Sequence, residues 1–209
     1  SVAHAAEHAR HSGGMLVQDT SWPGYEEIPA RVIEGYATLL GEVRDALAAR
    51  GRGMPDLAVV PVGVGSLAAA VAAHPDAPRH LAGVEAEEAA CALESVEAGR
   101  SRTASGSGWT IMAGLNCGTL ATLAWPAIRD RYQALVSVDD ARAAEAMRRL
   151  AAAGIVAGES GAASLAGLAE LRESSSREAA EARARLELGP GSRVLVLVTE
   201  GATDPEGYA

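Results

Sequence analysis

The 209-residue sequence predicts a doubly wound α/β domain with a mostly parallel sheet, and three observations support this fold class. Short apolar segments alternate with longer helical ones, which is the order that parallel strands and crossover helices produce. The apolar segments are continuous rather than alternating, as expected for strands buried on both faces. The sequence has no Phe and only 3% aromatic residues, so its core must consist of Ala, Val, Leu and Ile.

The first quarter of the chain favours two helices separated by a polar loop. Residues 1–12 favour a helix by propensity, and two glycines at 13–14 end it. A short strand is expected at 15–17, before a loop that contains Pro and Gly. An amphipathic helix is expected at 30–50, where the sequence Gly-Arg-Gly follows it.

The middle of the chain favours a strand–helix–strand–helix order. The apolar, β-branched segment 57–62 predicts a buried strand, and the small residues at 66–73 predict the helix that follows it. A second strand is expected at 81–85 and a helix at 87–98. The Gly- and Ser-rich segment 99–118 is too long for an ordinary connection, which is typical of a functional or mobile loop.

The last part of the chain continues the alternation. Residues 120–132 favour a helix in which Pro126 requires a kink or a break. A strand is expected at 135–138, and Asp139 is expected to cap the helix that extends to Ala153. Further helices are expected at 160–172 and 176–186, and the strongest strand prediction falls at 193–198.

Composition excludes several classes of function. The net charge of −9 argues against nucleic acid or an anionic membrane as the partner. No apolar run approaches the roughly 18 residues of a spanning helix, and no signal peptide is visible, so we expect a cytoplasmic protein. Two reduced, buried thiols are expected at Cys91 and Cys117, and no metal site is predicted.

The sequence contains no lysine, since all 18 basic residues are Arg. No side chain of this chain can therefore form a Schiff base with an aldehyde cofactor.

The most informative motif is the glycine loop Gly63-Val64-Gly65-Ser66-Leu67, between a predicted strand and a predicted helix. Glycines allow such a loop to turn so that backbone N–H groups point at one anion at the positive end of the helix. The lysine of a Walker loop is absent. A tight turn without a ligand remains open, and so does a dinucleotide site, because Glu85 follows Gly65 by 20 residues.

Three further residues are candidate site residues. Thr199 ends the last strand, where its hydroxyl can meet a ring nitrogen or simply cap the next turn. Glu159 starts a helix, where a carboxylate is favoured with or without a ligand. Asp19 lies in a loop with Trp22 and Tyr25, and is either an acid/base group, an ammonium anchor or part of a solvated loop.

In chain order, six segments together resemble the diaminopropionate ammonia-lyase family, a member of the fold-type II, threonine dehydratase-like pyridoxal-phosphate enzymes. The resemblance extends from about Gly14 to Asp204. The segments are VQDTSWPGYEEIP, EGYATL, PVGVGSLAAAV, WTIMAGLNCG, AGESGA and VTEGATD.

The resemblance implies pyridoxal 5′-phosphate as the cofactor and assigns roles to the candidate residues. The loop Gly63, Val64, Gly65, Ser66 and Leu67 would hold the 5′-phosphate. Thr199 would face the pyridine nitrogen, Glu159 would border the ring, and Asp19 would handle the substrate's amino group or α-proton. The loop 109–117 would flank the substrate entrance, where an oxidised pair of Cys91 and Cys117 is an alternative to free thiols.

The sequence also departs from this family. Members of the family are about twice as long as this chain, and their Schiff-base lysine precedes the segments matched here. We therefore expect a C-terminal part, with 1–13 as the tail of a missing smaller domain and 14–209 as part of the large cofactor-binding domain of the tryptophan synthase β-like fold.

The parent enzyme would convert 2,3-diaminopropionate, a small amino acid, to pyruvate and ammonia by α,β-elimination. This chain alone would be inactive, its partner would be the missing N-terminal half, and the relatives suggest a homodimer. The alternatives are a serine/threonine dehydratase-like enzyme and a non-catalytic ligand-binding module. A dinucleotide-dependent oxidoreductase is the least supported alternative.

Overall fold

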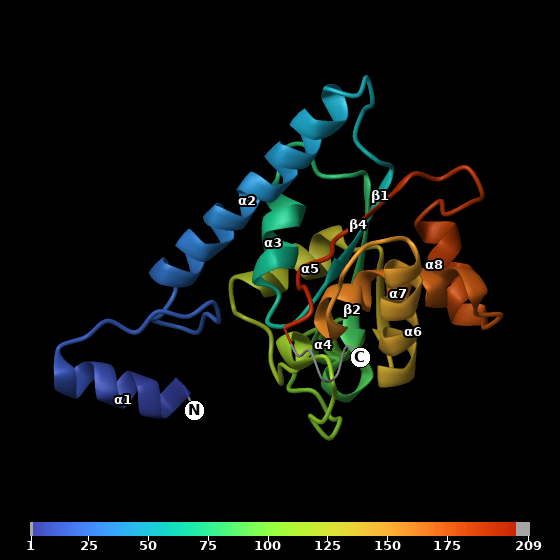
Figure 1. Cartoon of the computed structure of the whole chain (residues 1–209). Helices are drawn as coiled ribbons and strands as arrows, with labels where there is room; N and C mark the ends of the chain where they lie inside the picture. The colour runs from blue at the N-terminus through green and yellow to red at the C-terminus, as the bar shows by residue number, and fades with distance from the viewer. Residues whose placement is uncertain (1, 204–209) are drawn as a thin grey trace.

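Four apolar segments form one parallel sheet in the computed structural model, which describes residues 2–203 (Figure 1). The strands are β1 (Leu57–Pro61), β2 (His80–Ala86), β3 (Ala134–Val138) and β4 (Val194–Val196). Their order is β3-β2-β1-β4, with Leu57 paired to His80 on one side and to Val194 on the other. The predicted α/β class with a parallel sheet is confirmed.

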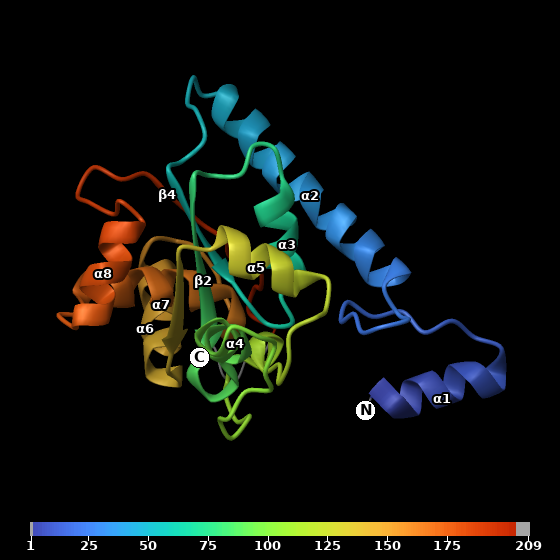
Figure 2. The ribbon, with the colours of Figure 1, turned by 180° about the vertical axis from the view of Figure 1, so that it is seen from behind.

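The helices that connect these strands cover both faces of the sheet. In Figure 1, α6, α7 and α8 lie on one side, and Figure 2 shows α5 crossing in front of the opposite face. The α-helices are α1 (Val2–Ser12), α2 (Glu27–Ala48), α3 (Ser66–Ala73), α4 (Cys91–Ala98), α5 (Ala124–Arg131), α6 (Asp140–Ala152), α7 (Glu159–Glu173) and α8 (Arg177–Arg185).

Alternate residues of β1 belong to two different hydrophobic cores. Leu57 and Val59 pack with α6, α7 and α8, whereas Ala58 and Val60 pack with α2, α3 and α5. Every residue of β1 and β2 is buried. Coverage of both faces explains why these strands read as continuous apolar runs.

The strand order reverses at the centre of the sheet. From β1 the chain moves outward through β2 to β3, and it then returns to place β4 on the other side of β1. Parallel α/β sheets bind ligands beyond the carboxyl ends of the strands at such a reversal point. The loops that follow β1 and β4 therefore lie where a ligand site is expected.

The sequence prediction is wrong at 15–17, where a strand was expected. These residues are extended but unpaired, and Met15 and Val17 are exposed. A strand needs a partner for its backbone groups, and no neighbouring strand of the described chain reaches this segment.

Other differences concern boundaries. α2 begins at Glu27, three residues before the expected start. The helix expected at 87–98 is interrupted at Ala90, which separates a 3₁₀ turn (Glu87–Ala89) from α4. Pro126 lies in the first turn of α5, where its missing N–H has no intrahelical partner to lose, so neither the kink nor the break is present. Asp139 caps α6 as predicted, accepting from the Arg142 N–H at 2.7 Å.

α1 stands apart from the rest of the molecule, joined to α2 by an extended segment (Figure 1). Its predicted span is confirmed from Val2 onward, and Ser1 lies outside the described residues, as does Asp204 at the end of the VTEGATD segment. No helix in the part of the chain that the structure describes is both long and apolar enough to span a bilayer.

Candidate active site

The glycine loop lies at the carboxyl end of β1 and opens α3, as predicted. Gly65 has φ +92° and directly precedes the helix. The first N–H groups of a helix have no intrahelical acceptor, so the Ser66, Leu67 and Ala68 amides are available at the positive end of α3. We call the five residues Gly63, Val64, Gly65, Ser66 and Leu67 the cup; this arrangement can bind an anion.

The surroundings require a glycine at position 65 and leave little space at Gly63. A Cβ on Gly65 would lie 2.8 Å from Cβ of Ala124 and 2.9 Å from Cδ1 of Ile128, and its left-handed backbone disfavours other residues. A Cβ on Gly63 would lie 3.0 Å from the Gly114 carbonyl oxygen and 3.1 Å from Sγ of Cys117. α5 and the loop before it therefore fix the shape of the cup.

Asp19 is brought beside the cup although it is 47 residues away from Ser66 in the sequence. The Ser66 hydroxyl donates to the Asp19 carbonyl oxygen at 2.9 Å. The Asp19 side chain is exposed, and its charge contributes to the raised pKa of the Cys117 thiol, for which burial is the larger cause. An exposed carboxylate next to the cup can meet a ligand's ammonium group.

Two contacts outside the predicted set fix the Asp19 loop. Ser21 is buried; its hydroxyl accepts from the Leu123 N–H at 2.9 Å and from the Thr122 hydroxyl at 3.0 Å. The rings of Trp22 and Tyr25 stack with centroids 4.5 Å apart. This stacked pair closes the loop on itself.

Thr199 and Glu159 lie on two neighbouring segments that Glu200 joins. The Glu200 carbonyl accepts from the Gly158 N–H at 3.1 Å, and its side-chain Oε2 accepts from the Ser160 N–H at 3.1 Å. Glu200 thus caps α7, whose first residue is Glu159. Thr199 is exposed and Glu159 is half-buried.

A chain of contacts connects this region to the cup. The Ser160 hydroxyl accepts from the Gly114 N–H at 2.9 Å, and the Gly114 carbonyl is the group that limits space at Gly63. Thr199 and Leu67 also line the same cavity of about 480 Å³, between α2 and β4. The start of α7 and Thr199 therefore lie at the same end of the sheet as the cup.

Both cysteines are free thiols beside the cup. Sγ of Cys91 lies 3.9 Å from the Gly63 carbonyl oxygen, and Sγ of Cys117 would lie 3.1 Å from a Cβ on Gly63. Burial is the main cause that raises the pKa of both thiols, with a further contribution to Cys91 from the Glu85 charge. These thiols are therefore protonated at neutral pH.

Glu85 is fully buried, and its place in the fold argues against the dinucleotide alternative. Its Oε1 accepts from the Ala92 N–H at 2.7 Å and its Oε2 from the Leu93 N–H at 2.8 Å. Burial raises the pKa of this carboxyl to about 7, although the two amide hydrogen bonds lower it. A carboxylate that caps α4 in this way cannot bind a ribose.

Sequence reasoning missed Ser21, Ser160, Glu200 and the true role of Glu85. The segments that contain Ser160 and Glu200, AGESGA and VTEGATD, were recognised as motifs. Nothing in either motif indicated that the two would bond to each other, because the contact joins residues 40 positions apart.

Comparisons with known proteins agree with this geometry. Residues 1–200 match the profile of the family described as pyridoxal-phosphate dependent enzyme. The diaminopropionate ammonia-lyase of Salmonella typhimurium is 36% identical over an alignment that covers 96% of this chain and 52% of that protein. The Escherichia coli K12 lyase is 34% identical, and its alignment likewise covers 52% of the lyase.

Solved structures show the same similarity. The selenomethionine-containing holo form of the Escherichia coli diaminopropionate ammonia lyase superposes with a TM-score of 0.86 at 33% identity, covering 99% of this chain and 53% of that one. A T.th. threonine deaminase superposes with a TM-score of 0.72 at 26% identity, covering 95% of this chain and 60% of that one.

The chain spans about half the length of the curated relatives it matches. Within that half, the family profile covers nearly every residue, and the cup lies at the reversal point of the parallel sheet. This chain belongs to the family of pyridoxal-phosphate dependent enzymes.

Proposed function

We propose that this chain is the C-terminal portion of a pyridoxal-phosphate dependent carbon–nitrogen lyase that converts 2,3-diaminopropionate to pyruvate and ammonia. The observation that carries the proposal is the cup, which offers free amides at the positive end of α3. The relatives of highest identity named above are diaminopropionate ammonia-lyases, which supports this substrate.

The residues of the cup fit the phosphate of the cofactor. Gly65 leaves open backbone where a side chain would collide with neighbouring atoms, and a side chain at Gly63 would make tight contacts there. The Thr199 hydroxyl would bond the pyridine nitrogen, and Glu159 would border the ring. When bound, the cofactor withdraws electrons from the α-carbon of an amino acid. Because the chain has no lysine, its own residues would hold the cofactor only non-covalently.

Asp19 is the residue that we assign to the substrate. Its backbone is held by Ser66 of the cup, and its carboxylate remains exposed to a ligand. The carboxylate would bind the ammonium group of a diamino acid or take up the α-proton. Asp19→Asn in the full-length protein should reduce turnover of 2,3-diaminopropionate more than turnover of serine or threonine.

The proposal is tested by mixing the chain with pyridoxal phosphate and then treating the mixture with borohydride. We expect binding that inorganic phosphate competes away, and no mass added at a side chain after reduction when the α-amino group has been blocked beforehand, because the chain has no lysine. Mass added at a side chain would contradict non-covalent binding.

Leu67→Asp should weaken cofactor binding by placing a carboxylate at the amino end of α3, where an acidic residue is tolerated by the helix. Leu67→Asn is the matched control, because it removes the same packing without adding charge. Equal binding by the two variants would contradict a phosphate at the cup.

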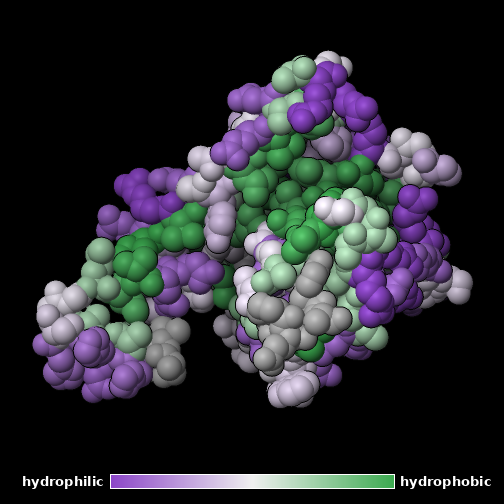
Figure 3. All heavy atoms as spheres, viewed as in Figure 1, coloured by the Kyte–Doolittle hydropathy of each residue, from purple (hydrophilic) through white to green (hydrophobic). Residues whose placement is uncertain are grey.

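We also propose that the lysine and the remaining half of the fold belong to an N-terminal portion of the same protein. Residues 14–209 would be part of the large domain and 1–13 the tail of a smaller one, in an enzyme that forms a homodimer. The uncovered apolar surface between α2 and β4 supports this, since Tyr36 and Val198 are 40% and 39% exposed there (Figure 3).

The coding sequence upstream of Ser1 tests this part of the proposal. We expect an in-frame segment that contains a lysine. A start codon immediately before Ser1 would instead favour the second candidate function, a non-catalytic ligand-binding module, which the absence of lysine also supports. A serine/threonine dehydratase is distinguished from the lyase by substrate assays of the full-length protein.

A further inference from the structure

Glu85 occupies a position beside the cup that the proposed chemistry does not use. It lies near the end of β2, directly after Val84, whose carbonyl accepts from the N–H of Val62 at 2.7 Å. Val62 is the last residue before the cup. Glu85 therefore lies at the same end of the sheet as the cup, on the neighbouring strand.

The Glu85 carboxylate fixes the beginning of α4. Ala90, which precedes this helix, offers no side-chain cap, and the two Glu85 oxygens accept from the Ala92 and Leu93 amides instead. A carboxylate at a helix amino end is favoured by the exposed N–H groups there. The two amide bonds thus hold the Glu85 carboxyl at the start of α4.

Cys91 connects Glu85 to the cup. Its thiol lies 3.9 Å from the Gly63 carbonyl oxygen, and its pKa is raised by burial and, next, by the charge of Glu85. Since Cys91 is the first residue of α4, movement of the helix start would be transmitted to Gly63. The contact joins a titratable group to the backbone that would surround an anion.

The charges that face Glu85 do not compensate its own. On α4 they are Glu94, which is acidic, and the neutral Cys91 thiol, while Cys117 approaches from the loop before α5. From β3 the paired residue is the uncharged Ser137. Among the described residues, no basic side chain is found to shift the pKa of Glu85. A buried carboxylate without a counter-charge disfavours a second anion nearby.

We propose that Glu85 is a proton-linked positioning residue of the cup, which takes up a proton from solvent when an anion binds at Gly63–Leu67 and releases it when the anion leaves. The inference rests on the proposed function, because it requires an anion in the cup. Linkage makes this coupling reciprocal. If anion binding raises the proton affinity of Glu85, protonation of Glu85 must tighten anion binding by the same factor.

The direction of the effect follows from this reciprocity. Raising the pH removes the proton from Glu85 and weakens binding at the cup. Because burial places the pKa of Glu85 at about 7, the change falls between about pH 6 and about pH 8. A structural role alone would not produce this dependence on pH.

Isothermal titration with sulfate, which does not titrate in this range, tests the inference. We compare the wild type, Glu85→Gln and the control Glu97→Gln, an exposed carboxylate on the same helix. We expect sulfate affinity to fall at least about 5-fold from pH 6 to pH 8 in the wild type and in Glu97→Gln, and to stay constant in Glu85→Gln.

The possible results separate this inference from the cup itself. Sulfate binding with the same pH dependence in wild type and Glu85→Gln would overturn the role of Glu85 and leave the cup intact. No sulfate binding at any pH would contradict the cup and the inference together. If Glu85→Gln does not fold, the wild type is titrated with sulfate near pH 7 in two buffers of different ionisation enthalpy, which measures proton uptake on binding. Proton uptake supports the inference, and its absence overturns it.

Discussion

Glycines at the amino end of α7 let the Glu200 backbone approach the helix. A Cβ on Gly161 would overlap the Glu200 carbonyl oxygen and lie 2.8 Å from its nitrogen. The close approach places the segment that contains Thr199 next to the start of α7. At the residue scale, the site depends on glycines that allow close backbone contacts as much as on reactive side chains.

Gly161→Ala should therefore destabilise the protein by about 1–3 kcal/mol, because the Glu200 segment must move to admit the methyl group. Gly41→Ala is the matched control: Gly41 is also helical, and its Cβ would meet nothing within 4 Å. That change should be neutral or stabilising by up to about 1 kcal/mol. Urea unfolding of both variants measures the difference; equal effects would contradict the tight packing at Glu200.

The pH dependence of stability reports the burial of Glu85. Burial raises the pKa of this carboxyl from its ordinary 4.5 to about 7, so the native state binds more protons than the unfolded state between these values. Its contribution is complete below about pH 4.5 and is lost as the pH rises through about 7, a change of about 3 kcal/mol.

The wild type should lose this stability relative to Glu85→Gln as the pH rises, and unfolding free energies measured across the window check it. Glu94→Gln is the control; hydrogen bonds from Ser105 lower the pKa of Glu94, so its contribution has the opposite sign and is lost as the pH falls. A flat difference between wild type and Glu85→Gln would contradict the burial of a titrating carboxyl.

Local signals in the sequence placed the cup before a helix and Glu159 at a helix start, and the structure has both there. The roles of these residues and of Thr199 toward a cofactor stay predictions. For Glu85 the spacing left a ribose contact open as an alternative. Its actual acceptor role depends on α4 folding back over the end of β2, which no local pattern encodes. Ser21 was missed for the same reason, since its partners lie about 100 residues away.

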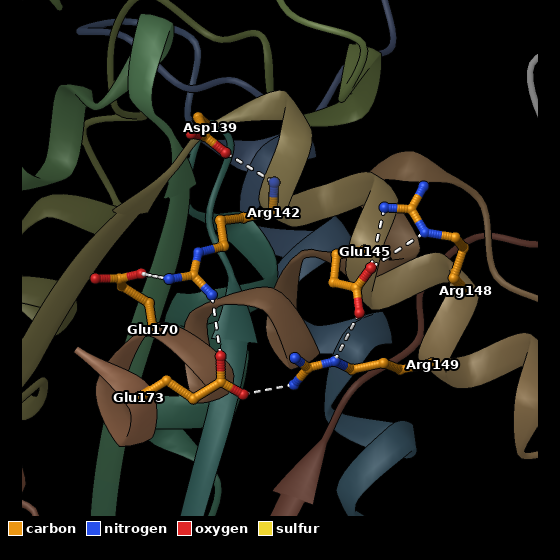
Figure 4. Close-up of polar contacts among 7 residues, drawn as sticks. All are labelled: Asp139, Arg142, Glu145, Arg148, Arg149, Glu170 and Glu173. Atoms are coloured by element: carbon orange, nitrogen blue, oxygen red, sulfur yellow. Dashed lines mark hydrogen bonds and ion pairs between the residues drawn. The ribbon is translucent and has the colours of Figure 1, made fainter.

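At the scale of elements, ion pairs join α6 to α7 on the outside of the molecule (Figure 4). Arg142 contacts Glu170 at 3.1 Å and Glu173 at 3.0 Å, and Arg149 bonds Glu173 at 2.6 Å. These side chains are 31–43% exposed, so solvent and salt screen them. The packing of Ala143, Ala146 and Leu150 against α7, rather than these pairs, holds the two helices together.

Glu173→Gln should lower the melting temperature by at most about 3 °C, with the difference vanishing at high salt. Glu181→Gln, which breaks an exposed pair with Arg177 within α8, provides the control. It should lower the melting temperature by a similarly small amount. Thermal unfolding in low and high salt measures both. A large decrease that persists in high salt would show that the pairs, not the apolar contacts, fix α6 against α7.

Prediction of helices and strands succeeded where a segment contained its own start and stop signals. It failed where contact with another segment determined the structure. The helix at 66–73 was predicted with its observed bounds, because Gly65 and the small residues mark it locally. The strand expected at 15–17 had the right composition and no partner. Pro126 was read as a break because its place in the first turn of α5 could not be known from the sequence.

At the scale of the whole molecule, β4 is an edge strand whose three residues are only half-buried, whereas β1 is buried throughout. Amide hydrogen exchange should therefore be much faster in β4 than in β1. β3 is the internal control, as the other edge strand with two buried ends. Equal protection of β4 and β1 would indicate that something already covers the β4 edge, contrary to the uncovered surface described above.

The central claim is that the cup holds the phosphate of pyridoxal phosphate without a covalent bond to this chain. Titrating ¹⁵N-labelled protein with pyridoxal phosphate and following the amide signals tests it most directly. The account predicts the largest changes at Gly63, Gly65, Ser66 and Leu67, smaller ones at Thr199, and their reversal by excess inorganic phosphate. Saturating changes confined to residues away from β1 and α3, or no change in the cup, would contradict it.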